Sequence, residues 1–289
     1  MSHDVLPVRV SVIITTKNEE KNIGACAESV KNQAYPYEKI EIIVVDNGST
    51  DRTKEIALRY TSLVYNAGPE RSAQRNFGAE KAQGEFLLFL DADMILSRNV
   101  IAEAVDFCEK EGGAAVYIPE KVVGEGFWIA VRNFERSFYD ATVIDCVRFV
   151  KKTAFNTAGG FDISLTGPED WDFDRKIRAK VATGIISAPL FHNEGVFNLS
   201  TYLRKKAYYA GNFEKYIGKW GKRDKIIRKQ FGIWYRYFGV FCEKGRWLRL
   251  VCHPVLTSGM YFLRILVGIE YLKKNSGFRV PGFPDYSGN

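Results

Sequence analysis

The sequence predicts an α/β protein, with a Rossmann-like, mostly parallel sheet flanked by helices and a C-terminal helical appendage rich in basic and aromatic residues. Short β-rich runs alternate with helical patterns from residue 8 to about residue 188, as expected when crossover helices join parallel strands. After Leu190 the pattern changes, and aromatic residues interleave with lysine and arginine. We therefore expect an α/β domain at residues 1–195 and a helical region at residues 196–289.

Six short runs rich in apolar and β-branched residues predict strands, and four stretches with helical spacing predict helices between them. The predicted strands are residues 9–15, 41–45, 63–65, 86–90, 114–118 and 144–150. The predicted helices are residues 20–32, 52–60, 71–83 and 99–111.

The net charge of +7 is unevenly distributed. Residues 201–289 contain 18 lysine and arginine residues against five aspartate and glutamate residues, so the first 200 residues carry net negative charge. A strongly basic half indicates contact with a polyanion, either a lipid headgroup surface or nucleic acid.

Several features favour a location at the cytoplasmic face of a membrane. The five cysteines are odd in number and form no CxxC pair, which fits a reducing compartment. The first ten residues show no signal-peptide pattern. The longest charge-free apolar stretch, residues 250–263, has about 14 residues, so we expect it to be too short to span a bilayer.

Polar clusters follow three of the predicted strands. They are residues 15–20 (TTKNEE), 46–51 (DNGSTD) and 91–93 (DAD). Ligands of open parallel sheets bind beyond the carboxyl ends of the strands. The three clusters are therefore expected to converge on one edge of the sheet.

The Asp91-Ala92-Asp93 element is a candidate metal site. It follows an apolar strand, and two close carboxylates provide the hard oxygen ligands that Mg²⁺ and Mn²⁺ prefer, with a diphosphate completing the octahedron. The alternative is a capping aspartate followed by a solvated turn aspartate, because aspartate often ends strands.

Four segments together resemble family 2 glycosyltransferases with the GT-A fold. They are residues 12–20 (VIITTKNEE), 44–53 (VVDNGSTDRT), 75–93 (RNFGAEKAQGEFLLFLDAD), and 159–162 (GGFD) with Glu169-Asp170. The resemblance extends to about residue 195 and implies a nucleotide-sugar-binding catalytic domain. It includes the membrane-associated polyprenyl and lipid-linked sugar transferases.

The resemblance implies how the donor and metal are bound. Glu19 and Asp46 would border the nucleoside pocket, although Asp46 could simply begin an Asx turn. Asp91 would reach the ribose or a metal-bound water, and Asp93 would bind the metal itself. His192 could supply an imidazole to the metal or diphosphate, or merely hydrogen-bond a neighbouring loop.

Further residues are donor-binding candidates. Arg71 and Arg75 could touch the donor or be helix-surface arginines, and Arg204 belongs to a charge run that could neutralise phosphates or be a solvated helical face. The whole donor-binding set is Thr15, Asn18, Glu19, Asp46, Arg71, Arg75, Asp91, Ala92 and Arg204.

By the same resemblance, the catalytic base comes from Glu169-Asp170 at the start of a helical pattern. Asp170 would deprotonate the acceptor hydroxyl while it attacks the anomeric carbon in line, which inverts the configuration. Mn²⁺ or Mg²⁺ would stabilise the leaving diphosphate. The alternative is that these acids only cap the helix and complement its dipole.

The basic aromatic region favours peripheral attachment to a membrane. Residues 226–236 combine large apolar groups with lysine and arginine at helical spacing, as in interfacial helices, and residues 255–274 form a second candidate. The alternative is that both segments are ordinary packing helices. Membrane attachment implies a lipid or lipid-linked sugar acceptor, although residues 94–98 depart from the Gln- and Pro-containing stretch of polyprenyl-phosphate mannose synthases.

Donor identity and two rival functions stay open. GDP-mannose is a mild preference over UDP-glucose or another UDP-hexose. A nucleotidyltransferase should carry a Gly-rich basic loop after the first strand, which residues 15–20 lack. A nucleic-acid-binding protein could use the basic half, but the acidic clusters would then have no role, so we expect no nucleic-acid partner.

Overall fold

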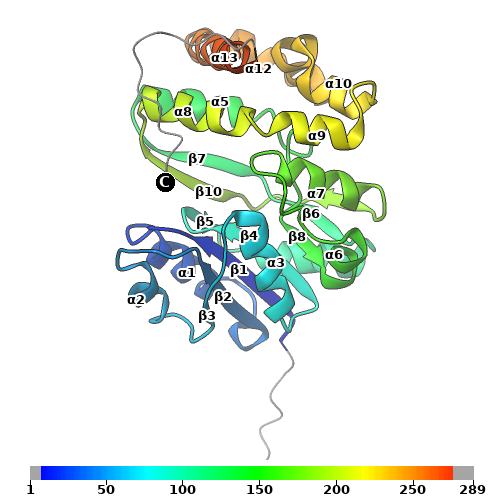
Figure 1. The fold of residues 1–289 in the computed structure, drawn as a ribbon. Coiled ribbons are helices and arrows are strands. Elements are labelled where there is room, and N and C mark those ends of the chain that lie inside the picture. The colour runs from blue at the N-terminus through cyan, green and yellow to red at the C-terminus, as the bar shows by residue number, and fades with distance from the viewer. Residues whose placement is uncertain (1–7, 276–289) are drawn as a thin grey trace, which may run out of the picture.

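The computed structural model describes residues 8–275, which fold into an α/β lobe covered on one side by layers of helices (Figure 1). The strands are β1 Val10–Thr16, β2 Ile40–Asp46, β3 Val64–Asn66, β4 Phe86–Asp91, β5 Met94–Leu96, β6 Ala115–Tyr117, β7 Glu120–Glu125, β8 Phe149–Lys151, β9 Thr183–Ile185 and β10 Leu190–Val196. The helices of the lobe are α1 Ile23–Lys31, α2 Thr53–Ala57, α3 Arg71–Lys81, α4 Val100–Lys110, α5 Phe127–Arg136, α6 Lys152–Ala158 and α7 Glu169–Arg178, with a 3₁₀ turn η1 Tyr37–Lys39.

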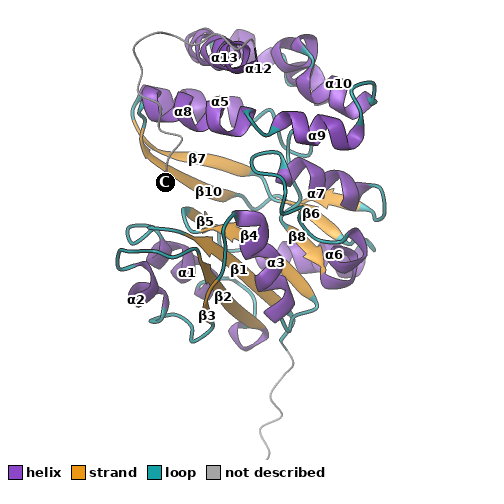
Figure 2. Cartoon of the chain, viewed as in Figure 1, coloured by secondary structure: helices purple, strands orange, loops and turns teal. Residues whose placement is uncertain are grey.

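The remaining helices follow β10. They are α8 Leu199–Ala210, α9 Phe213–Trp220, α10 Lys225–Phe231, the π-helical turn η2 Tyr235–Gly239, α11 Val240–Cys242, the 3₁₀ turn η3 Glu243–Gly245, α12 Leu248–Cys252 and α13 Pro254–Asn275. Figure 2 shows that this part of the chain is entirely helical and loop.

The central sheet has seven strands in the order β3-β2-β1-β4-β8-β6-β9. β3, β2, β1 and β4 are parallel to their neighbours, β8 is antiparallel to both β4 and β6, and β6 and β9 are parallel. A second sheet of three strands has the order β5-β10-β7. The predicted mostly parallel α/β architecture with a C-terminal helical appendage is therefore confirmed.

Alternating apolar side chains explain why helices cover both faces of the central sheet. Val12 and Ile14 of β1 pack with α1 and α4 on one face, whereas Ile13 packs with α3 on the other. The same alternation in β4 sends Leu88 to the first face and Phe89 to the second. A strand buried on both faces reads as a continuous apolar run, as β1 and β4 do.

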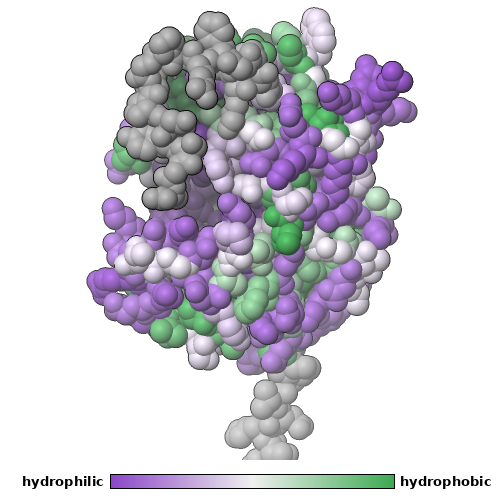
Figure 3. Space-filling model, viewed as in Figure 1, coloured by the Kyte–Doolittle hydropathy of each residue, from purple (hydrophilic) through white to green (hydrophobic). Residues whose placement is uncertain are grey.

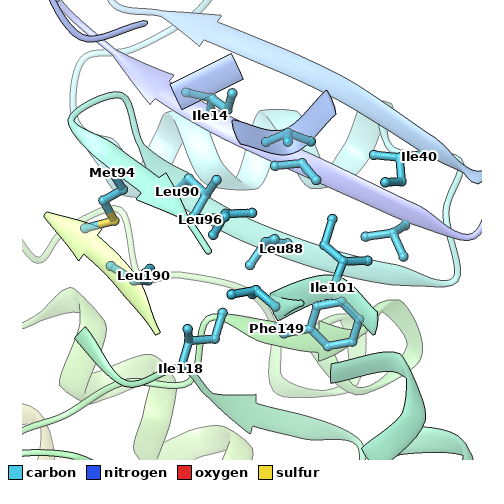
Figure 4. Close-up of a cluster of buried hydrophobic side chains, with 14 of the residues drawn as sticks. Ile14, Ile40, Leu88, Leu90, Met94, Leu96, Ile101, Ile118, Phe149 and Leu190 are labelled. Carbon is cyan, nitrogen blue, oxygen red and sulfur yellow. The ribbon is translucent and has the colours of Figure 1, made fainter. Parts of the chain in front are cut away.

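The first core cluster also joins the two sheets. Figure 4 shows Met94 and Leu96 of β5 and Leu190 of β10 beside Leu88 and Leu90 of β4. The second sheet is therefore anchored by apolar contact to the strand that ends in Asp91. This packing fixes the position of β10 relative to the carboxyl ends of β1 and β4.

The helical layers share a third apolar cluster with α5. Val131 and Phe134 of α5 pack with Phe241 of α11 and with Met260 and Leu263 of α13. In Figure 1, α5 and α8 lie between the small sheet and the outer helices α10, α12 and α13. The division at residue 195 stays a prediction, and the structure adds that α5, which precedes it, belongs to the core of the helical layers.

The expectation that the C-terminal apolar stretch is too short to span a bilayer is wrong on length. Within the described residues, Pro254–Leu272 of α13 is a 19-residue helical segment with mean hydropathy 1.4, which is long and apolar enough to cross a membrane. Of its 18-residue apolar stretch, 22% is buried inside the protein. Arg264 does not interrupt the helix because its guanidinium donates to Glu135 of α5 at 2.9 Å. Core helices of soluble proteins can meet the same criteria, so length and composition identify only a candidate span.

Strand boundaries differ most at residues 144–150. Only Phe149–Lys151 forms a strand, because side chains tie down the preceding turn instead of a β-ladder. Asp145 accepts the backbone N–H of Ala141 at 2.7 Å, and Asp174 of α7 accepts that of Val147 at 3.2 Å. β5, β7, β9 and β10 were not predicted, since each is short or alternates weakly.

Replacing Gly78 should destabilise the fold, because α3 meets β1 there without a side chain. A Cβ at Gly78 would overlap Cγ2 of Ile13, which is fully buried. We expect Gly78→Ala to lower the free energy of unfolding by about 1–3 kcal/mol in urea denaturation. Gly24→Ala in α1 is the matched control. The new Cβ would lie at an ordinary contact distance of 3.5 Å from Ile56, and alanine has a higher helix propensity than glycine. Equal losses would contradict this account.

Candidate functional site

Two arginines of α3 hold the carboxyl end of β4 to the start of α7. Arg71 and Arg75 are four residues apart and so project from the same helix face. Arg75 donates to Oδ1 of Asp91 at 3.1 Å and to Oδ1 of Asp170 at 2.6 Å. Arg71 lies 3.5 Å from Oδ2 of Asp91 and 2.9 Å from Oε1 of Glu169. Four predicted site residues far apart in sequence are thus brought together around Asp91.

The electrostatics of this cluster keep Asp91 ionised. Burial opposes the charge, but Arg75 and Arg71 together hold the pKa of Asp91 well below its usual range. Thr15 supports the same carboxylate by donating its hydroxyl at 2.9 Å. Glu169 behaves in the opposite way, because burial and the charge of Asp170 raise its pKa despite Arg71.

Asp93 faces a different partner from Asp91. Nε2 of His192, on β10, lies 3.2 Å from Oδ2 of Asp93, and Nδ1 lies 3.0 Å from Glu120 of β7. Burial lowers the pKa of His192, but hydrogen bonds to Asp93 and Glu120 overcome this and raise it to about 10. The imidazole is therefore fixed in orientation between two carboxylates.

A divalent cation fits this site as a partly protein-bound ion. Within residues 8–275, no group of three or more histidine, cysteine, aspartate or glutamate side chains converges on one point. Oδ1 of Asp93 is nevertheless buried without a hydrogen-bond partner. Mg²⁺ is commonly held by one or two carboxylates plus phosphate oxygens, so Asp93 and His192 would need a diphosphate to complete the ligand set. Asp91 is occupied by Arg75 and Thr15 in this arrangement.

The predicted nucleoside edge contains Glu19, Asn18 and Asp46. Glu19 is half-buried, accepts the side-chain amide of Asn22 at 2.6 Å, and has its pKa raised by burial. Asn18 adopts a left-handed φ of 55° and accepts the backbone N–H of Thr50 at 2.9 Å, so it shapes the loop. Asp46 is fully buried and accepts both the N–H and the hydroxyl of Ser49. These contacts hold the loop that follows β2, and a role for Asp46 at the nucleoside pocket stays a prediction.

Helix α8 covers the site, and Arg204 is its one residue in the predicted donor-binding set. Tyr209 packs its ring on Arg71, with 5.6 Å from the guanidinium carbon to the ring centroid, and the charge of Lys205 acts on Glu19. Arg204 is exposed, and its guanidinium donates to Thr201 on the same helix at 3.3 Å. Lys205 of the same basic run is exposed as well, and its positive charge opposes the rise in the pKa of Glu19.

One further site residue, Glu120, was missed. Glu120 orients His192 and is itself bound by Arg136 at 3.3 Å and Arg148 at 3.1 Å. Nothing in the local sequence marks Glu120, because its partners lie on other elements. Ala92 contributes only its backbone, whose N–H donates to the carbonyl of Thr15 at 3.1 Å, while its side chain is buried in the core.

Sequence comparisons identify related proteins. Residues 11–160, just over half of the chain, match the family model described as glycosyl transferase family 2. Glycosyltransferase AglE of Haloferax volcanii is 44% identical over 91 residues, which cover 29% of this chain and 30% of that protein. Beta-monoglucosyldiacylglycerol synthase of Nostoc is 25% identical over 251 residues, which cover 77% of this chain and 52% of that protein. The chain thus spans about half or less of the length of these curated relatives.

Solved structures show the same fold. Staphylococcus aureus TarS 1–349 in complex with UDP-GlcNAc matches with a TM-score of 0.55 and 18% identity, covering 94% of this chain and 92% of that one. Mannosyltransferase PcManGT of Pyrobaculum calidifontis, in complex with GDP-Man and Mn²⁺, matches with a TM-score of 0.55 and 22% identity, covering 96% and 79%. The predicted GT-A fold is therefore confirmed.

Removing Arg75 should destabilise the protein more than removing Arg71. The Arg75 side chain is 1% exposed and bridges Asp91 and Asp170, whereas that of Arg71 is 32% exposed. Taking one partner from a buried ion pair leaves an uncompensated charge, so Arg75→Met should cost about 3–5 kcal/mol in urea denaturation. Arg71→Met, the matched control, should cost clearly less because the Arg71 side chain is itself partly exposed to solvent, so its ion pairs are less desolvated than those of Arg75. The reverse order would refute the central role given to Arg75.

Proposed function

Because this chain belongs to glycosyl transferase family 2, we propose that it transfers a hexose from a nucleotide sugar to a lipid or lipid-linked sugar, inverting the anomeric configuration. The chain is a glycosyltransferase with the GT-A fold. Its donor, acceptor and metal are the parts that we propose.

One observation carries the proposal: Asp93 and Asp170 both lie near the carboxyl end of β4. Oδ1 of Asp93 is buried without a hydrogen-bond partner. Asp170 is held by Arg75, which also binds Asp91 at the end of β4. Asp93 would hold Mn²⁺ or Mg²⁺ with the donor diphosphate, and His192 would join it by releasing the proton that its contacts with Asp93 and Glu120 favour. A bound divalent cation neutralises charge that develops on a departing diphosphate. The Mn²⁺ in the PcManGT complex supports this assignment.

Asp170 is the base that we assign. Its side chain is 27% exposed, so a hydroxyl can approach, while Arg75 orients one carboxylate oxygen at 2.6 Å. The other oxygen is available to accept the acceptor proton as the hydroxyl attacks. Glu169 is almost fully buried against Arg71, which suits a role in positioning Arg71 rather than in proton transfer.

The donor is proposed as GDP-mannose or a UDP-hexose. The two solved relatives were obtained with UDP-GlcNAc and with GDP-Man, so both classes belong in the screen. Asn18 and Glu19 directly follow β1 and border the space beyond it, where a nucleoside would lie. Arg71 and Arg75 are already paired with carboxylates. Each would contact the diphosphate only by dividing its guanidinium between the diphosphate and those carboxylates.

Peripheral binding to the cytoplasmic face of a membrane is proposed from the outer helical layer. Large apolar side chains are exposed on η2, just before it, and on α12 and α13; they include Trp234, Phe238, Val251, Phe262 and Ile265. Basic residues alternate with them along the same segments. Aromatic groups beside lysine and arginine suit the headgroup region of an anionic bilayer. The lipid synthase of Nostoc supports a lipid-linked acceptor.

Donor binding should require Asp93. In calorimetry with GDP-mannose, UDP-glucose, UDP-N-acetylglucosamine and UDP-galactose, one donor should bind with Mn²⁺ and bind much more weakly without it. Asp93→Ala should weaken that binding by roughly a hundredfold, since a metal ligand is lost. Asp106→Ala on α4, whose side chain is 57% exposed, is the control and should bind normally. Metal-independent binding would refute the metal site.

Transfer should require Asp170 after donor binding. Asp170→Asn keeps the shape of the side chain but cannot accept the proton, so kcat should fall by roughly 10²–10⁴ while donor affinity changes little. Steady-state kinetics with the donor found by calorimetry measure both quantities. An unchanged kcat would exclude Asp170 as the base.

Membrane binding should depend on the exposed aromatic residues. The wild type should float with anionic vesicles at low salt, and less so as salt screens the charges. The double variant Trp234→Ser and Phe238→Ser should float much less, whereas Ile163→Ser, equally exposed but on the α/β lobe, should behave as wild type. Failure of the wild type to float would end the membrane proposal.

A further inference from the structure

A second group of cations lies beyond the donor site, beneath the outer helices. We call Arg132 of α5, Lys206 of α8 and Arg236 of η2 the cation cluster. The rings of Tyr202 and Trp171 border it: Arg132 lies 5.0 Å and Lys206 5.5 Å from the Tyr202 centroid, and Arg236 lies 6.0 Å from that of Trp171. Figure 3 shows a largely hydrophilic, hollowed surface between the α/β lobe and the helical layers on one face.

The acidic residues nearby are already paired. Arg132 binds Glu194 at 2.9 Å and Glu135 at 3.1 Å. Glu135 is also bound by Arg264 of α13 at 2.9 Å. Within the described part of the chain, neither Lys206 nor Arg236 forms an ion pair with a carboxylate. The cluster therefore holds more positive than negative charge.

The excess positive charge affects the pKa of Lys206. The side chain is partly buried, and burial together with repulsion from Arg132 and Arg236 lowers the pKa of Lys206 to about 8. Aromatic rings beside these cations attract them but supply no counter-charge. An anion entering between Lys206 and Arg236 would relieve the repulsion.

The cluster contacts two elements that carry the proposed reaction site, α7 and β10. Trp171, which faces Arg236, directly follows Asp170 in α7. Glu194, which binds Arg132, is two residues from His192 in β10. The donor diphosphate is assigned to Asp93 and His192, so the cluster is available to a second anion.

We propose that Lys206 and Arg236 bind a phosphate group of the acceptor, so that this enzyme glycosylates a phosphate-bearing acceptor rather than a neutral lipid. This rests on the proposed function, because it defines the acceptor of the same site. Two cations without carboxylate partners match a phosphate monoester or diester, and lysine and arginine are the side chains that bind phosphate oxygens most strongly. A neutral acceptor would leave both partly buried charges without a counter-charge. The phosphate could belong to a lipid headgroup or to a phosphodiester-linked alditol chain.

The test compares three acceptors with the donor identified by calorimetry. They are a short-chain prenyl phosphate in detergent micelles, a soluble glycerol-phosphate oligomer, and diacylglycerol in the same micelles. We expect transfer to one or both phosphate-bearing acceptors and none to diacylglycerol. Transfer to the prenyl phosphate alone identifies a lipid source, and transfer to the oligomer alone identifies a polymer.

Substitutions then assign the binding to the cluster. Lys206→Gln and Arg236→Gln should each raise KM for the phosphate-bearing acceptor by roughly tenfold to a hundredfold with little change in kcat. Lys206→Arg should restore most of the affinity. Lys215→Gln on α9, an exposed lysine with the same charge change, should leave KM unaltered. Lys206→Gln should also melt no lower than wild type, because it removes a repelled charge.

Direct binding separates this proposal from the proposed function. Calorimetry of prenyl phosphate against the matching prenol, without donor, should show preference for the phosphate in wild type and loss of it in Lys206→Gln. Absence of any donor binding would refute the glycosyl transfer proposed above, whereas this titration would still decide the phosphate site. Three results would overturn the proposed phosphate site. They are equal binding of prenol and prenyl phosphate, equal use of diacylglycerol as acceptor, and an unchanged KM in both variants.

Discussion

The ion pairs of Arg75 are the constraint on which the site depends. A guanidinium that is almost fully buried bridges the end of β4 to the start of α7 through Asp91 and Asp170. α3 can deliver Arg75 to that point because Gly78 lets the helix lie directly on Ile13 of β1. Close packing at Gly78, which has no side chain, thus sets the position of Arg75, which lies three residues earlier and about one helical turn away on α3.

A second set of charges connects the site to the helical layers. β10 carries His192 toward Asp93 and Glu194 toward Arg132, so one strand contacts both the proposed metal ligand and the cation cluster. Glu135 then joins Arg132 to Arg264 of α13. Buried charges of this kind are costly unless paired, which explains why these residues form linked ion pairs across two helices and a strand. The proposed acceptor side is built on this framework.

Much of the lobe could be predicted because its signals are local. The apolar runs of β1, β2 and β4 and the helical spacing of α3 and α4 locate these elements within a few residues. Residues 144–150 were misassigned since side chains of Asp145 and Asp174, rather than a ladder, bind that backbone. The apolar stretch at residues 250–263 was misjudged because the partner of Arg264 lies 129 residues away on α5.

The sequence by itself determined the family, the α/β alternation and the convergence of acidic clusters at the strand ends, because these follow from short-range periodicity and motif spacing. Only the tertiary structure decided the partner of each side chain. It joined Asp91 to Arg75 and gave both oxygens of Asp46 to Ser49. Such pairings depend on the relative placement of α3, α7, α8 and β10, which long-range packing fixes and no local pattern encodes.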